Sequence, residues 1–363
     1  MLRRERSFDY WLPSCALGLS ALGVLAIYSA TRLDDVGFWR KQILWVLLAT
    51  GVAAVVAFID YRILVRLSRP LYILNLVMLL AVLRAGHEAM GAQRWIGLPG
   101  GFRFQPSEFA KLITIITLSA YAEQAPSLNT LRGIGKALLY ILLPMGLILK
   151  QPDLGTSLVV LAIWFGIMWV AGARLRHLAL IVFAGLVAFA GMWHVGLIKD
   201  YQKQRFTSFL NPEADRRGSG WHTIQSKIAI GSGGLTGKGL FHGTQTQGDF
   251  IPEQHTDFVS TVIGEELGFL GSSLLLVVFF CLICRGLRIA GETDDAHGRL
   301  IAVGVVSMLM FHVFVNLGMT VHIMPVTGVP LPFLSYGGSS MLMNMVAIAL
   351  LLNIRRHHED LQF

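Results

Sequence analysis

The chain has 363 residues, of which 54% are hydrophobic and only 14% carry a formal charge. About a quarter of the residues in a soluble domain are charged, so this composition excludes an ordinary water-soluble fold and indicates a polytopic membrane protein. The formal net charge of +8 does not indicate nucleic-acid binding, because the basic residues are scattered between hydrophobic segments rather than grouped on one face. We therefore expect a phospholipid bilayer, and no nucleic acid, around this chain.

The first apolar segment, Trp11 to Ala30, is longer than the apolar core of about 7–15 residues in a signal peptide. We interpret it as a retained membrane span. Further apolar segments follow, and together they predict an all-α polytopic membrane protein with a single membrane domain over 1–363. The sequence predicts about ten transmembrane helices, near 11–30, 42–59, 70–84, 107–124, 136–149, 155–171, 178–196, 262–284, 300–321 and 337–354.

The distribution of basic residues predicts the orientation of these helices. Short segments on the side of the two termini hold more Lys and Arg than those on the opposite side, so we expect both termini in the cytoplasm. The segment 197–261 then forms one large extracytoplasmic loop between the seventh and eighth helices. The polar segments 85–108, 150–157 and 322–340 fall on the same outer side. We therefore expect an outer-face site and no cytoplasmic nucleotide donor.

Two polar motifs precede predicted helices on this outer side. In FQPSEFAK, at 104–111, Glu108 and Lys111 are three residues apart and share a helical face. Such a pair either positions a cation near an anionic substrate or forms a structural ion pair, and the residues alone favour the structural role. In QPDLGTS, at 151–157, Asp153 precedes the next span. A turn followed by a helix cap is the simplest interpretation of that carboxylate.

The long loop ends in the segment PEQHTDF, at 252–258, directly before the next apolar span. Asp257 is the strongest candidate for a general base, because loss of solvation at a membrane boundary raises the pKa of a carboxyl toward neutral pH. The alternative is that Thr256 or Asp257 caps the helix that follows. The loop is also basic, but Lys238 is not followed by the Ser or Thr of a nucleotide-binding P-loop. Its cations fit a diphosphate or anionic lipid headgroups.

The segment 330–340 is rich in proline and glycine. Backbone that is not helical at membrane depth is tolerated only against protein or a wet cavity, so we expect a cavity there. On the preceding span, His312 and Asn316 are four residues apart, and we interpret them as interhelical hydrogen-bonding groups rather than as a proton relay. Cys281 and Cys284 lie in an apolar segment without a second Cys or His pair, so no metal site is predicted from them.

Six separated motifs, taken together, resemble the SEDS family of polytopic glycosyltransferases, which includes RodA, FtsW and SpoVE. They occur in the family order across nearly the whole chain. The loop sequence QSKIAIGSGGLTGKG, followed by HGTQTQ, is more similar to the elongation branch, RodA, than to the division branch, FtsW. The six motifs are AQRW at 92–95, FQPSEFAK at 104–111, QPDLGTS at 151–157, PEQHTDF at 252–258, EELG at 265–268 and GVPLPFLSYGGSS at 328–340.

This resemblance implies a peptidoglycan glycosyltransferase that polymerises lipid II into β-1,4 glycan strands, with release of undecaprenyl diphosphate, for cell elongation and rod shape. By the resemblance, Asp257 is the general base of an inverting displacement. Glu108 and Lys111 line the same cavity, which outweighs their structural interpretation. The expected substrate-binding residues are Arg94, Gln105, Ser107, Asp153, Arg205, Lys227, His255, Thr256, Ser335 and Tyr336.

The departing diphosphate needs cationic stabilisation, so Mg2+ or Mn2+ is an expected requirement, without assigned protein ligands, and no organic cofactor is expected. Besides lipid II, the resemblance implies a class B penicillin-binding transpeptidase and other elongation-complex membrane proteins as partners. It implies the bacterial inner membrane as the location, with the active site facing the periplasm. Three alternatives stay open: a lipid II flippase, which one-sided polar residues disfavour, a scaffold for the transpeptidase, and an FtsW-like septal polymerase.

Overall fold

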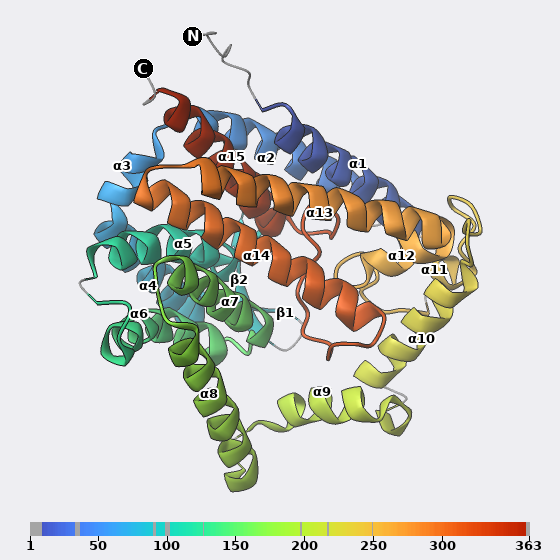
Figure 1. The fold of residues 1–363 in the computed structure, drawn as a ribbon. Helices are drawn as coiled ribbons and strands as arrows, with labels where there is room; N and C mark the ends of the chain where they lie inside the picture. Colours follow the sequence, from blue (N-terminus) through green and yellow to red (C-terminus); the bar gives the residue numbers. More distant parts are fainter. Residues whose placement is uncertain are drawn as a thin grey trace.

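Ten long helices form a bundle in the computed structural model (Figure 1), which describes residues 9–32, 37–89, 92–98, 102–125, 127–196, 198–215, 218–248 and 250–360. The count refers to these ranges. The long helices are α1 (Trp11–Thr31), α2 (Phe38–Phe58), α4 (Ser68–Ala85), α5 (Pro106–Gln124), α6 (Leu131–Lys150), α7 (Leu154–Val170), α8 (Leu175–Val195), α13 (Gly268–Glu292), α14 (Ala296–Thr320) and α15 (Gly338–Asp360).

Each predicted span overlaps one of these helices, so the prediction of a multi-pass helical membrane protein is confirmed. Within the described ranges, seven helices are long and apolar enough to cross a membrane by length and composition, namely α1, α2, α6, α8, α13, α14 and α15. Helix α7 is apolar but has only 17 residues. Helices α4 and α5 lie where two further spans were predicted, but they are not among these seven. Helix α5 buries several polar side chains.

The all-α prediction is wrong for the segment 85–108, because a small antiparallel sheet lies there. Strand β1 (His87–Ala89) pairs with β2 (Ala92–Leu98), and β2 pairs with β3 (Phe102–Phe104). The aromatic and β-branched residues of this segment favour strands, but elements this short cannot be told from a polar loop by hydrophobic pattern. Strand β2 packs against α4 and α5, and Arg94 on β2 reaches the turn between α6 and α7, where it donates to the Gln151 carbonyl.

The segment 197–261 is more regular than the predicted loop. It contains α9 (Asp200–Leu210), the 3-10 helix η2 (Pro212–Asp215), α10 (Ser219–Ser232) and α11 (Thr244–Gln247), and α12 (Val259–Glu266) begins within it. Another short helix, α3 (Tyr61–Arg66), joins α2 to α4. These helices are short and amphipathic or polar, so their apolar residues do not form the long runs by which the spans were recognised.

The predicted span 262–284 is interrupted between α12 and α13. Gly268 has φ +63°, and a Cβ atom at this position would lie 2.3 Å from the main-chain nitrogen of Gly237. The loop at 234–237 occupies this space, since the amide of Phe269 donates to the carbonyl of Gly234 at 2.9 Å. A contact between segments more than thirty residues apart therefore sets the helix break, and an apolar run cannot show it.

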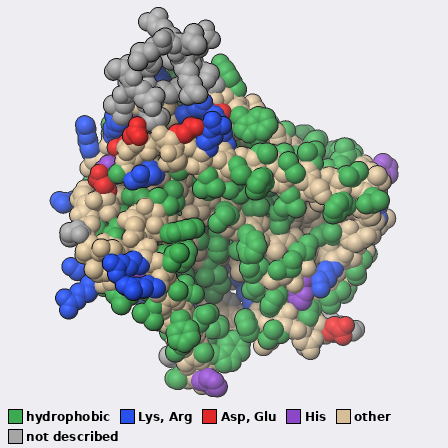
Figure 2. Space-filling view, viewed as in Figure 1, with side chains coloured by type: hydrophobic (Ala, Val, Ile, Leu, Met, Phe, Trp, Pro, Cys, Tyr) green, Lys and Arg blue, Asp and Glu red, His purple; other side chains and the backbone are tan. Residues whose placement is uncertain are grey.

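The core lies around α14 and α15, which are largely buried, whereas α8 is exposed along almost its whole length and extends away from the bundle in Figure 1. Hydrophobic side chains cover most of the face in Figure 2, while Lys and Arg gather mainly along its left and upper margin. An exposed apolar surface of this kind suits a lipid environment, because apolar side chains that face lipid are not exposed to water.

The two ends of the bundle differ in chemistry. At one end, Asp9, directly before α1, forms ion pairs with Arg285 at 2.7 Å and with Arg355 near the end of α15. The start of α14 lies at this end too, because the Tyr61 hydroxyl donates to Asp295 at 2.7 Å. The opposite end gathers the starts of α5, α7 and α12 and the end of α14. That end holds the candidate site.

Candidate active site

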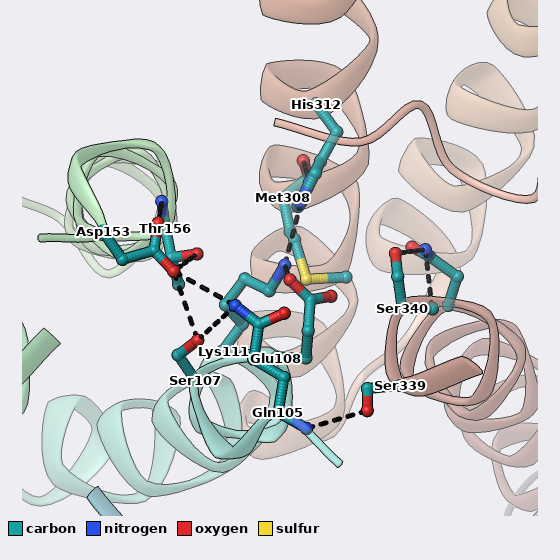
Figure 3. A network of polar contacts seen from close by, with 11 residues as sticks. Gln105, Ser107, Glu108, Lys111, Asp153, Thr156, Met308, His312, Ser339 and Ser340 are labelled. Atoms are coloured by element: carbon teal, nitrogen blue, oxygen red, sulfur yellow. Dashed lines mark hydrogen bonds and ion pairs between the residues drawn. The ribbon is translucent and has the colours of Figure 1, made fainter. Parts of the chain in front are cut away.

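The start of α5 is joined to the starts of α7 and α15. Pro106 occupies the first turn of α5, where its missing N–H costs no hydrogen bond. Just before it, the Gln105 amide contacts the Ser339 hydroxyl at 3.0 Å, while its side-chain nitrogen contacts Ser107 Oγ at 3.0 Å and Asp153 Oδ2 at 3.3 Å. Figure 3 shows these groups converging from separate helices. The two predicted outer motifs thus meet in one polar cluster.

Asp153 is the N-cap of α7, as the turn-and-cap interpretation predicts. Its Oδ1 accepts from the Thr156 amide at 3.1 Å, and its Oδ2 accepts from the Thr156 hydroxyl at 2.9 Å and from the Ser107 hydroxyl at 3.3 Å. The side chain is buried. A capping carboxylate with this many donors is fixed in orientation, and it lies beside the start of α5.

Glu108 and Lys111 form the ion pair that their spacing predicts. Lys111 Nζ lies 2.8 Å from Glu108 Oε1 and 3.0 Å from His312 Nε2 on α14 (Figure 3). The other imidazole nitrogen, Nδ1, lies 2.7 Å from the Met308 carbonyl, so it carries the ring proton and Nε2 accepts from the ammonium. The interhelical role predicted for His312 is confirmed. All three side chains are buried.

Asp257 lies in the turn that leads into α12. The N-cap of α12 is Phe258, without a side-chain capping bond, so neither Thr256 nor Asp257 caps this helix. The main-chain carbonyl of Asp257 accepts from Asn316 Nδ2 at 2.9 Å, and the Asp257 carboxylate lies against Gly328. The residue as a whole is half-buried. A carboxylate whose backbone is fixed in this way can take a proton from a bound hydroxyl.

Burial raises the pKa of the Asp257 carboxyl to about 6. Four charged groups modify this effect: Arg205 and Arg94 lower the pKa, whereas Glu253 and Asp153 raise it. The carboxyl is therefore largely ionised at neutral pH and still basic enough to accept a proton, which is the balance a general base requires.

Arg94 and Arg205 bring positive charge to this carboxyl from two different elements. Arg94 Nε donates to the Gln151 carbonyl at 2.8 Å, and its Nη2 donates to the Pro152 carbonyl. Arg205 Nη1, on α9, donates to the Thr327 carbonyl at 3.1 Å. These carbonyl oxygens are neutral acceptors, and they orient each guanidinium. The two cations can therefore stabilise an anion beside Asp257.

His255 and Tyr336 line a neighbouring aromatic cluster with Phe38. The His255 ring stacks on Phe38 at a centroid distance of 4.4 Å, and the Tyr336 ring lies 5.0 Å from Phe38. The Tyr336 amide donates to the His255 carbonyl at 2.9 Å, which joins the segment 330–340 to the Asp257 turn. Aromatic surface beside polar groups suits an amphipathic ligand.

The hydroxyls of Ser335 and Thr256 are engaged locally. Ser335 Oγ is buried and accepts from the Leu331 amide at 2.8 Å, while Thr256 Oγ1 donates to the Glu253 carbonyl at 2.9 Å. Lys227, on α10, contacts His322 Nδ1 at 3.1 Å, and its charge is not among those that shift the Asp257 pKa. The predicted substrate-binding roles of these three residues thus have no added support from the geometry.

Two features of the site were not recognised from the sequence. Asn316 contacts Asp257 through its amide, and Glu265 on α12 binds Lys238 at 2.6 Å together with the start of α11. Both contacts join segments far apart in the chain. The i, i+4 spacing of His312 and Asn316 on one span was the only sequence signal that pointed to the first.

The described residues include no group of three or more His, Cys, Asp or Glu side chains that could hold a metal ion. The Asp153 carboxylate, at the candidate site, already accepts hydrogen bonds from the amide and the hydroxyl of Thr156. The described residues therefore do not fit a protein-bound Mg2+ or Mn2+ centre.

Comparisons with known proteins agree with these features. The family of cell cycle proteins that comprises FtsW, RodA and SpoVE matches residues 10–360. The peptidoglycan glycosyltransferase MrdB of Escherichia coli K12 is 40% identical over 95% of this chain and 92% of its own length. Stage V sporulation protein E of Bacillus subtilis is 37% identical over 98% of this chain and 99% of its own.

Solved structures of similar fold lead to the same family. A peptidoglycan synthase complex that coordinates polymerisation and crosslinking contains a chain with a TM-score of 0.84 and 32% identity, covering 97% of this chain and 99% of that one. The rod shape determining protein RodA of Thermus thermophilus has a TM-score of 0.71 and 32% identity, with 98% of each chain covered. The chain therefore belongs to the FtsW, RodA and SpoVE family, the SEDS proteins.

Proposed function

We propose that this chain is a peptidoglycan glycosyltransferase that polymerises lipid II into β-1,4 glycan strands, with release of undecaprenyl diphosphate, for cell elongation and rod shape. One observation carries the proposal: the Asp257 carboxyl, whose pKa burial raises to about 6, lies within the electrostatic reach of Arg94 and Arg205. A base beside two cations is what glycosyl transfer from a diphosphate requires. Related chains that carry the name peptidoglycan glycosyltransferase support the same reaction.

In this reaction Asp257 accepts the proton of the acceptor sugar's 4-hydroxyl. The oxygen so activated attacks the anomeric carbon of the donor sugar, the bond from that carbon to the diphosphate oxygen breaks, and the configuration inverts. The departing diphosphate takes the electron pair of that bond. Arg94 and Arg205 stabilise the negative charge that develops there, and each is held in place by main-chain carbonyls.

Glu108 and Lys111 complete the cavity in this proposal. The ammonium of Lys111 is buried between a carboxylate and an imidazole, so it is held rigidly one helix away from the Asp257 turn. A rigid buried cation in this place adds positive potential for the diphosphate without side-chain motion during the reaction. The predicted substrate contacts of Gln105, Ser107, His255 and Tyr336 remain part of this proposal.

We further propose that both termini lie in the cytoplasm, that all ten long helices span the bacterial inner membrane, and that the site faces the periplasm. The gathering of the site at the end of the bundle opposite Asp9 and Arg355 supports this orientation. Lipid II that has crossed to the outer leaflet would then supply donor and acceptor from the same side. A requirement for Mg2+ or Mn2+ would come from the substrate's diphosphate.

A class B penicillin-binding transpeptidase is the proposed partner, together with other elongation-complex membrane proteins. The related peptidoglycan synthase complex, in which polymerisation and crosslinking are coordinated, supports this pairing. The exposed helix α8 and the apolar faces of α13 leave surface for a partner's span as well as for lipid.

The experiment that tests the proposed function incubates purified protein with lipid II and a divalent ion, with and without the transpeptidase. Wild type should form glycan chains, and Asp257→Asn should form none, because the change is nearly isosteric and removes the basic oxygen. Asn75→Leu, a substitution on α4 of a side chain without a hydrogen-bond partner among the described residues, serves as the control for expression and purification. Equal chains from wild type and Asp257→Asn would move the chemistry elsewhere, and lipid II transfer across liposomes without chains would identify a flippase.

A further inference from the structure

Asn316 connects two segments of the candidate site through a single amide group. It lies near the end of α14, is fully buried, and donates from Nδ2 to the main-chain carbonyl of Asp257 at 2.9 Å and to that of Val329 at 2.8 Å. Asp257 precedes α12 and Val329 follows the end of α14, so the two carbonyls belong to segments far apart in the chain that meet at the end of α14. The Asn316 side chain therefore sets the separation between them.

The chemistry of this position admits few other side chains. Both partners are carbonyl oxygens, so the site needs two N–H donors on one nitrogen and no charge. Among the described residues, Asn316 Oδ1 is buried without a hydrogen-bond partner, so the amide is held by its nitrogen alone. Aspartate would place acceptors against acceptors, and leucine, of similar volume, would leave both carbonyls unpaired.

The segment bound by Asn316 also confines the carboxylate of Asp257. Gly328 precedes Val329 and has φ +73°, and a Cβ atom there would lie 3.3 Å from Asp257 Oδ2. On its other side, this segment rests on α7, where a Cβ at Gly155 would lie 2.8 Å from Val329 Cγ2. The Asp257 carboxylate thus lies against a backbone segment that packs on α7 and accepts a hydrogen bond from Asn316.

Helix α14 connects the hydrogen bonds of Asn316 to the buried ammonium of Lys111. His312 is one turn before Asn316 and contacts Lys111 Nζ at 3.0 Å. Because successive turns of a helix are separated by about 5.4 Å, two neighbouring turns of one helix hold the Asp257 turn and the buried ammonium in register. A shift at Asn316 changes the position of the base relative to the rest of the cavity.

We propose that Asn316 is a positioning residue of the glycosyl transfer reaction, which fixes the Asp257 carboxylate by clamping its main-chain carbonyl to that of Val329. This inference rests on the proposed function. The Asn316 side chain is fully buried, and its nitrogen is engaged by the two main-chain carbonyls. It acts through the placement of the base, and a displacement of the order of 1 Å at a catalytic group can lower the rate by about 100-fold.

The test compares Asn316→Leu with Asn75→Leu as a matched control. Asn75 is also fully buried and lies on α4, and neither of its polar side-chain atoms has a hydrogen-bond partner among the described residues. Polymerisation of lipid II by Asn316→Leu should show kcat lowered by about 100-fold with KM near the wild-type value, because substrate contacts are kept. Asn75→Leu should keep both constants.

The pH dependence gives a readout that general loss of structure would not produce. Releasing the clamp lets the Asp257 carboxyl move toward water, so the acid limb of kcat/KM should move to lower pH in Asn316→Leu and stay in place in Asn75→Leu. The charged groups that face this carboxyl, and that the variants leave unchanged, are Arg205 on α9, Arg94 on β2, Glu253 in its own turn and Asp153 before α7.

A second variant covers the case in which Asn316→Leu does not fold. Gly328→Ala adds a methyl group to the clamped segment on the carboxylate side, and it should also lower kcat with KM retained. Unchanged kcat in Asn316→Leu, or in Gly328→Ala where only that variant folds, would overturn the proposal. Equal losses in Asn316→Leu and Asn75→Leu, or an unmoved acid limb, would also overturn it.

Failure of this proposal is distinguishable from failure of the proposed function. If Asp257→Asn polymerises like wild type, the proposed role of Asp257 is wrong and the clamp positions no base. If Asp257→Asn is inactive and Asn316→Leu is fully active, Asp257 keeps its role and the clamp is only structural.

Discussion

At the scale of single residues, the most telling arrangement is a buried ion pair whose role the sequence leaves open. Glu108 and Lys111 are almost completely buried, so their charges are stabilised by the ion pair between them and by the contact of Lys111 with His312. Removing one partner of such a pair typically costs about 3–5 kcal/mol, because the other charge stays buried alone. Loss of activity in a single variant therefore cannot separate a structural role from a chemical one.

A pair of variants makes that separation. Lys111→Met should lower the free energy of unfolding by about 3–5 kcal/mol and reduce turnover, whereas Glu108→Gln with Lys111→Met should recover most of the stability. If the ammonium serves the substrate, turnover of the double variant stays low. Thermal unfolding in detergent and polymerisation of lipid II measure the two effects, and recovery of both would return the pair to a structural role.

The titration of Asp257 leads to a second prediction at this scale. Its pKa is raised above the ordinary value of 3.8 to about 6, so the carboxyl loses its basic form as the pH falls through 6. The kcat/KM of polymerisation should therefore decrease below about pH 6 and be level above it until another group titrates. A rate that stays constant down to pH 4 would contradict the assignment of Asp257 as the base.

At the scale of elements, Glu265 anchors the segment 238–247 to α12. Its carboxylate accepts from Lys238 Nζ at 2.6 Å and from the amides of Gln245 and Thr246 at 2.8 and 2.9 Å, while the side chain is fully buried. The neighbouring Glu266 accepts from the Ser29 hydroxyl at 2.5 Å, which adds α1 to the same junction. The helix that follows Asp257 is held in place by these contacts.

Glu265→Gln should therefore destabilise the fold by about 3–5 kcal/mol, since the ammonium of Lys238 loses its buried partner and an amide nitrogen faces backbone donors. The matched control is Glu292→Gln, which breaks the exposed pair between Arg288 and Glu292 and should leave the melting temperature unchanged. Thermal unfolding of both variants in detergent tests this. Equal melting temperatures for Glu265→Gln and wild type would contradict the anchor.

The sequence predicted elements well where a single local signal suffices. Long apolar runs identified the helices, and the position of Asp153 before an apolar run identified the cap of α7. The three strands were missed because elements of 3 to 7 residues leave no readable period. The break at Gly268 was missed because its cause is the contact with Gly237, which no local pattern contains.

At the candidate site too, local contacts were predicted from the sequence and contacts between distant segments were not. The spacing of Glu108 and Lys111 predicted their ion pair, because three residues place side chains on one helical face. The tie between Asn316 and Asp257 spans 59 residues and depends on how the end of α14 meets the start of α12. Likewise, the charge of Lys227 is visible in the sequence, whereas its contact with His322 depends on the fold.

Across the whole molecule, the ion pairs of Asp9 and the candidate site lie at opposite ends of the bundle. The ion pairs of Asp9 join the start of α1 to α13 and α15 at one end, and Asp257, Lys111 and Arg94 gather toward the other. In the proposed orientation, with the termini in the cytoplasm, the end that holds Asp257 would face the outer leaflet, from which lipid II would be supplied. The same arrangement disfavours a flippase, which needs a path open to both faces.

The measurement that tests this account most directly uses proteoliposomes in which the termini face the lumen and lipid II is supplied to one leaflet at a time. We predict glycan chains from wild type only when lipid II is in the outer leaflet, on the side of Asp257, and none from Asp257→Asn. Chains formed equally from the leaflet on the side of the termini, or formed equally by Asp257→Asn, would contradict it.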